Sequence, residues 1–416
     1  MNRWTTGLLS AVMPLALAAL CSAAGPAAQG DKAQTPSSIS VVVNADIAFP
    51  TANSLSYYQA AGTQLTYQSD VYTGGFGIQG GFFGTSRVNS VPSLSAPCLY
   101  VSDAGSNDIA SISVSTQQML GNFKGSQTDD GSSNGIGLAV NASYLYASFT
   151  ASNTIGTFAL QSGCGLSFLG DIPATGLQGG SITGMAVTGK MLVVAYGDGS
   201  IQSFNVTGGM PASNNDLQNS TGYTALNTLG WFAGPSMPSG VDITQDGQFA
   251  IFGDISATST VEVSSLTTGK LSTTVAYPLI GVEGTGVDAG AIRLSPDESL
   301  LYIANSESGT VTAAYFNPTT GKIMRGCTSK TLQGFNFRPW LGSVVTRDTT
   351  GTGSVLYVGE FGRDYLEINH GPASAVGILT VTSKGGTCTL TEASTSPVQL
   401  VFPGALSIAV YPPRPF

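Results

Sequence analysis

Side chains that could transfer protons or hold anions are scarce in this sequence, and many of them gather within one region. Only 9% of the 416 residues are charged, and there is a single histidine. Three short segments between residues 283 and 370 nevertheless carry arginines, carboxylates and that histidine. They are GVEGTGVDAGAIR with Glu283, Asp288 and Arg293, FNFRPWLG with Arg338 and Trp340, and VGEFGRDYLEINHGP with Glu360, Arg363, Asp364, Glu367 and His370.

These residue types suit chemistry at a carbonyl group. An arginine binds a carboxylate through two hydrogen bonds and stabilises a developing oxyanion. A glutamate or a histidine can take a proton from an attacking water. We therefore predict a catalytic role for Arg293, Arg338, Glu283, Glu360 and His370, and a substrate-binding role for Asp288, Arg363 and Trp340. The alternative is that these arginine–carboxylate groups only pin long loops.

The composition predicts the kind of scaffold that must position these residues. Glycine is abundant, with 54 residues, whereas the helix-forming residues Glu, Lys and Arg are rare. β-Branched and aromatic residues are plentiful, which favours many short strands joined by tight turns. The net charge of −9 leaves no basic patch to neutralise phosphates, so we expect no binding to nucleic acid or anionic membranes.

Residues 1–24 have the features of a secretory signal peptide. Arg3 precedes an apolar run from Leu8 to Leu20, and small residues follow up to Ala24. We expect cleavage after Ala24, a flexible segment over residues 25–37, and export to the periplasm or the extracellular space. Leu20 is bulkier than the residue that precedes a lipidated cysteine, which argues against a lipid anchor at Cys21. No later run approaches the about 20 apolar residues of a membrane span.

The rest of the chain repeats one pattern about every 50 residues. A short apolar run and a turn are followed by a burst of apolar residues, a polar turn and a second alternating run. The bursts are CLYVSD, YLYASF, MLVVAYGD, FAIFGD, LLYIAN and VLYVGEF, which begin at residues 98, 144, 191, 249, 300 and 355. Each unit offers four strands, and such a repeat is typical of a β-propeller blade. One four-stranded sheet cannot bury its two apolar faces alone, so blades must stack around a ring.

Counting first strands predicts seven blades over residues 38–416. Candidates lie near residues 87–94, 135–141, 181–188, 238–244, 289–295, 341–347 and 404–411. The last has no burst after it, while the segments SISVVVNA, NSLSYYQAAG and QLTYQSDVY near the N-terminus lack a first strand. We therefore predict that the C-terminal strand completes the N-terminal blade, which also leaves fewer exposed sheet edges. GGFGIQGG at residues 74–81 contains GxGxxG without a following helix, so we interpret it as a loop between two blades.

The segment LSPDESLLYIANSESGTVTAAYFNPTTGKI resembles a repeat of the seven-bladed lactonase-type propellers, the group of 6-phosphogluconolactonase-like and YVTN-repeat proteins. The shared pattern is SPD, then LYxAN, a Gly-Thr/Ser-Val turn, and a Gly-Lys turn before the fourth strand. It is clear in residues 290–323, fair in 238–271 and 98–122, and loose elsewhere. The resemblance is more specific for the fold than for the chemistry.

The four cysteines beyond residue 24 fit this map of blades. Cys98 and Cys164 would lie in blades two and three, and Cys327 and Cys388 in blades six and seven. Disulfides Cys98–Cys164 and Cys327–Cys388 between adjacent blades are compatible with this placement, and free buried thiols are the alternative.

The resemblance implies an enzyme that hydrolyses a lactone, or cyclises the hydroxy acid, at the mouth of the channel, and the predicted signal peptide implies that it is exported. Related lactonising propellers use histidine with arginine and glutamate, and the single His370 departs from that pattern. A copper site needs several histidines and is excluded. We predict no cofactor, although a calcium ion could be held if Asp242, Asp254, Asn305 and Glu360 converge.

Two functions therefore stay open. One is a lactone hydrolase acting on a small-molecule lactone, and the other is a non-catalytic propeller that binds a partner in the envelope or outside the cell. A phosphorylated sugar lactone fits an exported chain poorly, and few basic residues are available to hold a phosphate. We expect a monomer.

Overall fold

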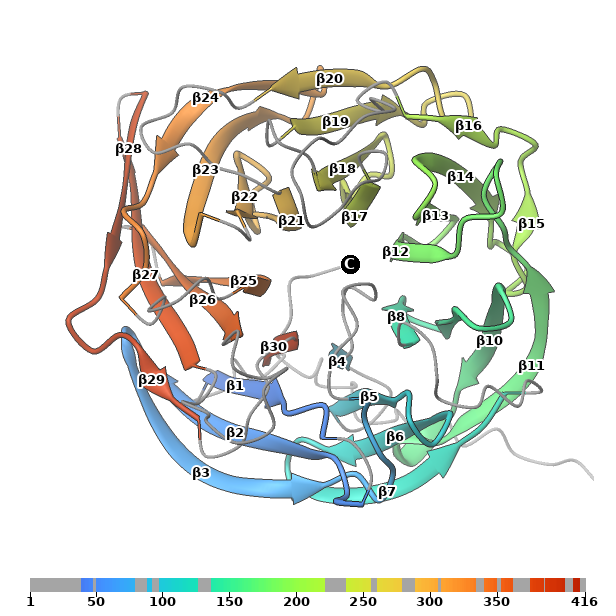
Figure 1. Cartoon of the computed structure of the whole chain (residues 1–416), viewed down its shortest axis with the longest axis horizontal. Coiled ribbons are helices and arrows are strands. Elements are labelled where there is room, and N and C mark those ends of the chain that lie inside the picture. The colour runs from blue at the N-terminus through green and yellow to red at the C-terminus, as the bar shows by residue number, and fades with distance from the viewer. Residues whose placement is uncertain are drawn as a thin grey trace, which may run out of the picture. The chain divides into compact units, whose positions relative to one another are not determined.

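Seven β-sheets stand around a common centre in the computed structural model of this protein (Figure 1). The structure describes residues 39–47, 50–78, 88–91, 97–125, 136–220, 237–255, 260–278, 289–305, 308–333, 340–349, 353–361, 375–384, 386–400 and 407–411. All of them belong to one compact unit, Ser38–Phe416. We call each sheet a blade and number the blades from the one that contains the first strand.

The strands follow one order in every blade, from the centre of the ring outwards. Blade one contains β30 (Ser407–Tyr411), β1 (Ile39–Asn44), β2 (Ser54–Ala61) and β3 (Gln64–Tyr72). Blade two contains β4 (Val88–Val91), β5 (Cys98–Asp103), β6 (Asp108–Ser113) and β7 (Gln118–Phe123). Blade three contains β8 (Ile136–Val140), β9 (Tyr144–Phe149), β10 (Thr154–Leu160) and β11 (Leu166–Pro173).

Blades four to seven repeat this arrangement. Blade four contains β12 (Ile182–Val187), β13 (Met191–Tyr196), β14 (Ser200–Asn205), β15 (Ala212–Ser213) and β16 (Gln218–Asn219). Blade five contains β17 (Met237–Ile243), β18 (Phe249–Ile255), β19 (Thr260–Ser265) and β20 (Val275–Pro278). Blade six contains β21 (Ala289–Leu294), β22 (Leu300–Asn305), β23 (Thr310–Asn317) and β24 (Lys322–Thr328). Blade seven contains β25 (Trp340–Thr349), β26 (Gly353–Phe361), β27 (Ala375–Lys384), β28 (Thr387–Glu392) and β29 (Val398–Gln399).

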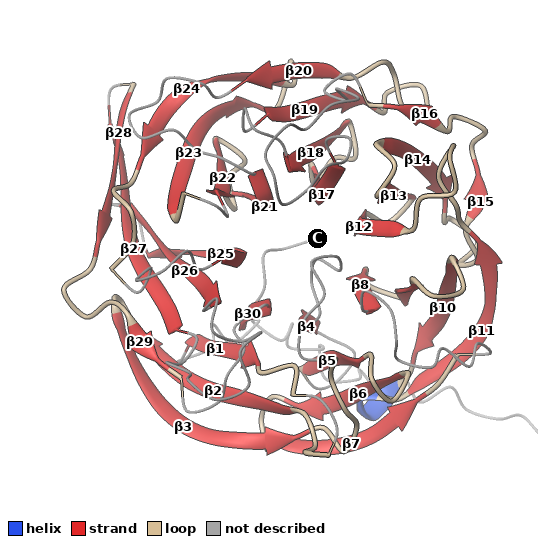
Figure 2. Cartoon of the chain, in the orientation of Figure 1, coloured by secondary structure: helices blue, strands red, loops and turns tan. Residues whose placement is uncertain are grey.

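The all-β, seven-bladed propeller predicted from the sequence is confirmed. Each inner strand contacts the inner strands of both neighbouring blades, so β30, β4, β8, β12, β17, β21 and β25 form a closed circle. Nearly all of the described residues are in strands and turns, apart from a single 3₁₀ turn at Ser162–Cys164 (Figure 2). None of the helices within the described ranges has the length and apolar character needed to cross a membrane.

The apolar core lies between the blades rather than in the middle of the ring. The buried side chains form seven clusters, and each cluster takes its residues from two neighbouring blades. Alternate residues of the second strands face opposite neighbours: Tyr302 packs toward blade seven, while Leu301 and Ile303 pack toward blade five. This is the period-2 pattern of a strand that is buried on both faces. The buried Tyr146 and Tyr357 also donate their hydroxyl hydrogens to the carbonyl oxygens of Gly209 and Gly62 in the next blade.

The ring closes as the sequence predicted. β30 pairs antiparallel with β1, with Ala409 opposite Val42 in the register. Ile408 and Val410 pack against blade seven, and Ala409 packs against blade two. The last described strand of the chain therefore contributes to the interfaces on both sides of blade one.

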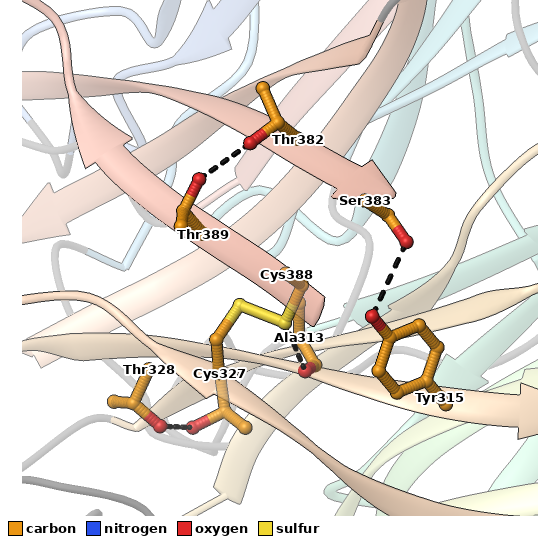
Figure 3. Close-up of a disulfide and its surroundings, with 9 residues drawn as sticks. Ala313, Tyr315, Cys327, Thr328, Thr382, Ser383, Cys388 and Thr389 are labelled. Atoms are coloured by element: carbon orange, nitrogen blue, oxygen red, sulfur yellow. Dashed lines mark hydrogen bonds between the residues drawn. A yellow bond between two sulfur atoms is a disulfide. The ribbon is translucent and has the colours of Figure 1, made fainter. Parts of the chain in front are cut away.

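Both predicted disulfides are confirmed. Cys98–Cys164 joins blades two and three, and Cys327–Cys388 joins blades six and seven. The first pair is buried in the core, whereas the second is only partly buried and lies between the outer strands β24 and β28 (Figure 3). Because disulfides persist in oxidising compartments, two of them in one chain indicate such an environment.

Blades four and seven differ from the expected four strands. The outermost position of blade four is divided between the two-residue strands β15 and β16, which both pair with β14. In blade seven, β29 adds to β27 beside β28.

Candidate functional site

Two of the eight predicted site residues have side chains that the structure describes, Arg293 and Glu360. Trp340 is described as the first residue of β25, where its backbone pairs with Phe361. The other five, Glu283, Asp288, Arg338, Arg363 and His370, lie outside the described residues.

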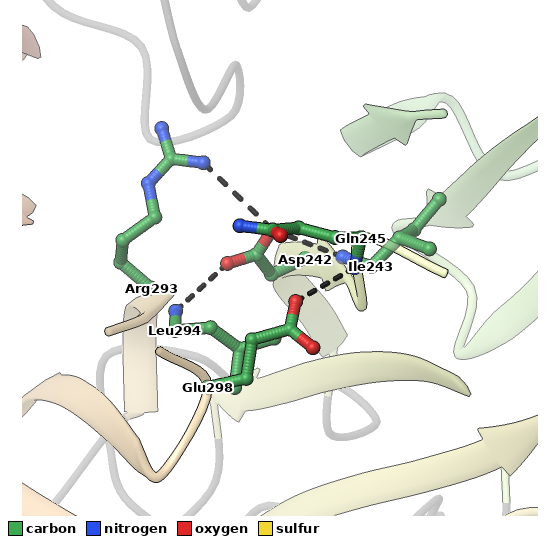
Figure 4. A network of polar contacts seen from close by, with 6 residues as sticks. All are labelled: Asp242, Ile243, Gln245, Arg293, Leu294 and Glu298. Atoms are coloured by element: carbon green, nitrogen blue, oxygen red, sulfur yellow. Dashed lines mark hydrogen bonds and ion pairs between the residues drawn. The ribbon is translucent and has the colours of Figure 1, made fainter. Parts of the chain in front are cut away.

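Arg293 lies on the inner strand of blade six and reaches across to blade five. Its Nη1 is 3.8 Å from Oδ1 of Asp242 on the inner strand β17, and its side chain is 36% exposed (Figure 4). Among the inner-strand side chains that the structure describes, Arg293 is the only cation. A guanidinium has five N–H donors, which is more than one contact of this length uses. Arg293 can therefore also donate hydrogen bonds to a bound anion.

Asp242 is held firmly by the backbone. Its Oδ1 accepts a hydrogen bond of 2.9 Å from the amide of Ile243, and its Oδ2 accepts one of 2.8 Å from the amide of Leu294. Nearby, Oε1 of Glu298 accepts a 2.6 Å bond from the amide of Gln245 (Figure 4). With its carboxylate engaged in this way, Asp242 is suited to orienting Arg293 and to joining two blades.

Glu360 occupies a different environment, at the blade six–blade seven interface. It lies near the end of β26, opposite Leu341 of β25 and Ala375 of β27. It is only 1% exposed, and neither carboxyl oxygen has a hydrogen-bond partner among the residues that the structure describes. A methyl group built on Gly377 would collide with Oε1 of Glu360 and lie 3.2 Å from Cδ1 of Leu332. Gly377 and Leu332 therefore lie beside the carboxyl group.

The protonation of Glu360 follows from this burial. Burial raises the pKa of its carboxyl group from 4.5 to about 8, because the charged form loses its hydration, and the negative charge of Glu392 adds to the rise. Glu392, on the outer strand β28, is half-buried and accepts hydrogen bonds from the amide of Gln333 and the hydroxyl of Ser396. A carboxyl group poised near neutral pH beside a hydrogen-bonded carboxylate is the usual setting of an acid–base residue.

Glu360 differs from the polar residues that occupy the same position in three other blades. Asn44, Asp103 and Asn305 take the corresponding place at the end of the second strand in blades one, two and six, and all three are buried. Each makes side-chain hydrogen bonds: Asn44 with Asn53, Asp103 with Asn53, and Asn305 with Thr310 and Thr312. In blades one, two and six the residue at this position is tied to a neighbouring segment, whereas the Glu360 carboxyl group accepts no hydrogen bond from the residues that the structure describes.

Asp103 belongs to a second buried acidic group, between blades one and two, which the sequence analysis did not single out. Burial raises the pKa of Asp103 to about 8, and the nearby Asp108 and Asp46 contribute to the rise. Asp103 accepts a 2.7 Å bond from Asn53, and the segment around Gly75 crosses directly over it. The group ties a crossing segment to blade two and has little room for a ligand.

Arg293 and Glu360 lie near opposite ends of the inner strands, and therefore near opposite openings of the central channel. We call these the two ends of the ring. Arg293 is next to the last residue of the inner strand β21 and pairs with Tyr302, whereas Glu360 pairs with Leu341 near the start of the inner strand β25. Ala289 and Arg293 are four residues apart, which corresponds to about 13 Å along the strand. The strand ends that border residues 279–288, 334–339 and 362–374, where the other candidates occur, are at the Glu360 end.

The proposed calcium ligands are spread over the same two ends. Asp242 lies at the Arg293 end, while Asp254, Asn305 and Glu360 lie near the ends of second strands in three different blades. Among the residues that the structure describes, no group of three or more His, Cys, Asp or Glu side chains is arranged to hold a metal ion.

Sequence reasoning missed Glu392 and Leu332, which shape the surroundings of Glu360. Glu392 is one charged residue in the fourth strand TCTLTE, and Leu332 follows β24 within KTLQG. Neither belongs to the repeated pattern. The only signal was that charge is rare in this chain, so that every carboxylate merits attention.

Comparison with known proteins places the fold among solved propellers. No family model and no curated protein sequence matches the chain. A Bacteroides fragilis protein provisionally named a 6-phosphogluconolactonase is 16% identical, with a TM-score of 0.60 over 91% of this chain and 99% of that one. A Lactobacillus plantarum protein is 15% identical, with a TM-score of 0.64 over 90% and 99%. The periplasmic gluconolactonase PpgL of Pseudomonas aeruginosa is 14% identical, with a TM-score of 0.50 over 69% and 80%. At these identities the likeness concerns the fold, and the chain has the seven-bladed architecture of the lactonase-type propellers.

Proposed function

We propose that the protein is an exported, lactonase-like propeller that hydrolyses a lactone, with Glu360 as the residue that takes the proton. The observation that carries this proposal is the buried carboxyl group of Glu360, which has no hydrogen-bond partner in the described part of the chain and whose pKa is raised to about 8. The likeness to a protein named a periplasmic gluconolactonase supports the substrate class and the export. The two disulfides also support export.

The chemistry assigned to Glu360 is general-base catalysis. Its ionised carboxylate takes a proton from a water molecule while the water oxygen bonds to the lactone carbonyl carbon. The tetrahedral intermediate then breaks the ring C–O bond, and the proton passes to the departing alkoxide. The sum is lactone plus water giving the hydroxy acid, with Glu360 returned to its starting form. The reverse sequence would be the cyclisation.

The test is a screen of unphosphorylated and phosphorylated sugar lactones and of simple lactones with the mature protein. We expect turnover with kcat/KM that rises with pH and levels off above about pH 8, because only the ionised carboxylate is a base. The variant Glu360→Gln should lose about 100-fold in kcat/KM and lose the pH dependence. Glu298→Gln, which also exchanges a carboxylate for an amide but lies at the other end of the ring, should keep both.

Arg293→Ala distinguishes the two ends of the ring. A loss of turnover in Arg293→Ala together with full activity in Glu360→Gln would move the active site to the Asp242–Arg293 pair. If the lactones are not turned over at all, the second candidate takes precedence, a propeller that binds a partner without catalysis. The burial of Glu360 favours that alternative, because a catalytic base must be reached by water.

A further inference from the structure

We propose that Ser329–Gln333 forms a strap that covers Glu360, and that Glu392 is the latch that keeps the strap closed. The role of the strap, which is to control how water and substrate reach the buried base, rests on the proposed function. The covering of the Glu360 carboxyl group by the strap does not depend on that function.

The strap leaves the outer strand of blade six and crosses toward blade seven. At the blade six end, the amide of Ser329 donates to the carbonyl oxygen of Val311 at 2.8 Å, and the hydroxyl of Ser329 accepts from the amide of Val311 at 2.9 Å. The amide of Leu332 donates to the carbonyl oxygen of Gly309 at 2.9 Å. Three bonds to the backbone of one strand and its preceding turn therefore fix this end.

The middle of the strap reaches the same part of blade seven as the Glu360 carboxyl group. Leu332 is 2% exposed and packs with Leu356, Val358 and Leu379 of blade seven. A methyl group built on Gly377 would collide with Oε1 of Glu360 and lie 3.2 Å from Cδ1 of Leu332, so the two side chains lie on the same side of Gly377. We infer that moving Leu332 away from this position exposes the carboxyl group.

Within the described ranges, the blade seven end is held by one side chain. The amide of Gln333 donates to Glu392, 3.0 Å from Oε2 and 3.2 Å from Oε1. Ser396 steadies Glu392 with a 2.7 Å hydrogen bond and accepts a 3.0 Å bond from the amide of Ile378. Gln333 is exposed and Glu392 is half-buried, so water can compete for this contact more readily than for the buried contacts at the other end. The strap is thus built to open from the blade seven side.

The test measures access to Glu360 without measuring catalysis. The full mature protein is treated with a water-soluble carbodiimide and glycine ethyl ester, and the modification of Glu360 is followed by peptide mass spectrometry. Amide hydrogen exchange of Leu332 and Gln333 is measured in parallel. We expect Glu392→Ala to speed up both the modification of Glu360 and the exchange of Gln333 by about tenfold, and Leu332→Ala to speed up the modification.

Glu298→Ala is the matched control, because Glu298 also accepts a backbone N–H from a neighbouring blade, at Gln245. It should leave the modification of Glu360 unchanged. The proposal is overturned if neither Glu392→Ala nor Leu332→Ala alters the rate at Glu360. It is equally overturned if the buried Glu262 gains the same modification rate, because the whole ring would then have loosened. An absence of lactone turnover would count against the proposed function alone.

Discussion

At the scale of single residues, the ends of the second strands show how one position of a repeat can serve two purposes. Asn44, Asp103 and Asn305 each make at least one side-chain hydrogen bond to a neighbouring segment. Glu360 has one more methylene group than aspartate and lies beside Leu332 and Gly377. A buried carboxyl group without a partner costs stability when it ionises. Such a cost is expected where a residue has a role other than stability.

The raised pKa of Glu360 makes stability depend on pH in a definite direction. Between pH 4.5 and about 8, the unfolded chain ionises this group while the folded protein keeps it protonated. Raising the pH through this window therefore favours unfolding, and the loss ends above about pH 8, where both states are ionised. We expect Glu360→Gln to remove a contribution on the order of a few kcal/mol from this decline.

Urea unfolding at pH 5, 6.5, 8 and 9 measures the effect. The decline should be shallower in Glu360→Gln, although not absent, because burial also raises the pKa of Asp103 to about 8. Identical pH dependence in the wild type and the variant would show that Glu360 is already ionised in the folded protein at neutral pH.

At the scale of elements, the repeated sequence pattern is clearest in the turns between first and second strands, where the same hydrogen bonds recur. In LSPDES the Ser295 hydroxyl donates to Asp297 at 2.6 Å and accepts from the amide of Leu300 at 3.0 Å. In TQDGQ the Thr244 hydroxyl likewise donates to Asp246 at 2.7 Å and accepts from the amide of Phe249 at 3.0 Å. The Ser/Thr-x-Asp spacing therefore closes the turn, which explains why this part of the pattern was recognisable.

The glycine-rich segment that begins at Gly74 illustrates a different constraint. A methyl group on Gly75 would lie 2.5 Å from Oδ2 of Asp103 and from Oγ of Ser106. The amide of Phe76 donates to the Ser106 hydroxyl at 2.8 Å, so the segment cannot move away without losing this bond. The described part of the segment, up to Ile78, thus crosses from blade one onto blade two, and its glycines allow the close approach.

We expect Gly75→Ala to destabilise the protein by about 2 kcal/mol or more, since either the backbone or the buried Asp103 must shift. Gly189→Ala is the control, because a methyl group there meets no atom within 4 Å and φ is not in the left-handed region. Thermal unfolding should show a lower Tm for the first variant and little change for the second. Equal Tm values would mean that the crossing segment adapts freely.

The sequence predicted elements better than contacts between elements. The alternation of apolar residues and the turn residues identified the strands, and the missing first strand at the N-terminus identified the closure. Glu392 and Leu332 were not predictable, because their importance depends on how β28 and the segment after β24 meet across two blades. The spacing of residues within one segment does not predict how two segments from different blades are aligned. The divided outer edge of blade four was also missed, since two-residue strands leave no period to detect.

At the scale of the whole molecule, the disulfides do not lie at the place where the ring is closed. The disulfides join blades two and three and blades six and seven, with sequence separations of 66 and 61 residues. By loop entropy each is worth about 4 kcal/mol. Neither spans the junction between the ends of the chain in blade one. That junction depends on β30, whose backbone pairs with β1 and whose side chains enter the clusters on both sides.

A buried charge in β30 should therefore open the ring at its non-covalent junction. Ala409 is 6% exposed and packs against blade two, so in Ala409→Asp the carboxylate can neither reach water nor find a partner among the apolar residues of that cluster. We expect a loss of about 3 kcal/mol or more. Thr66→Asp adds the same charge to β3, the exposed outer strand of the same blade, and should change stability by less than about 1 kcal/mol. Urea unfolding of both variants with the disulfides intact makes the comparison, and equal midpoints would show that the ring holds together without its last strand.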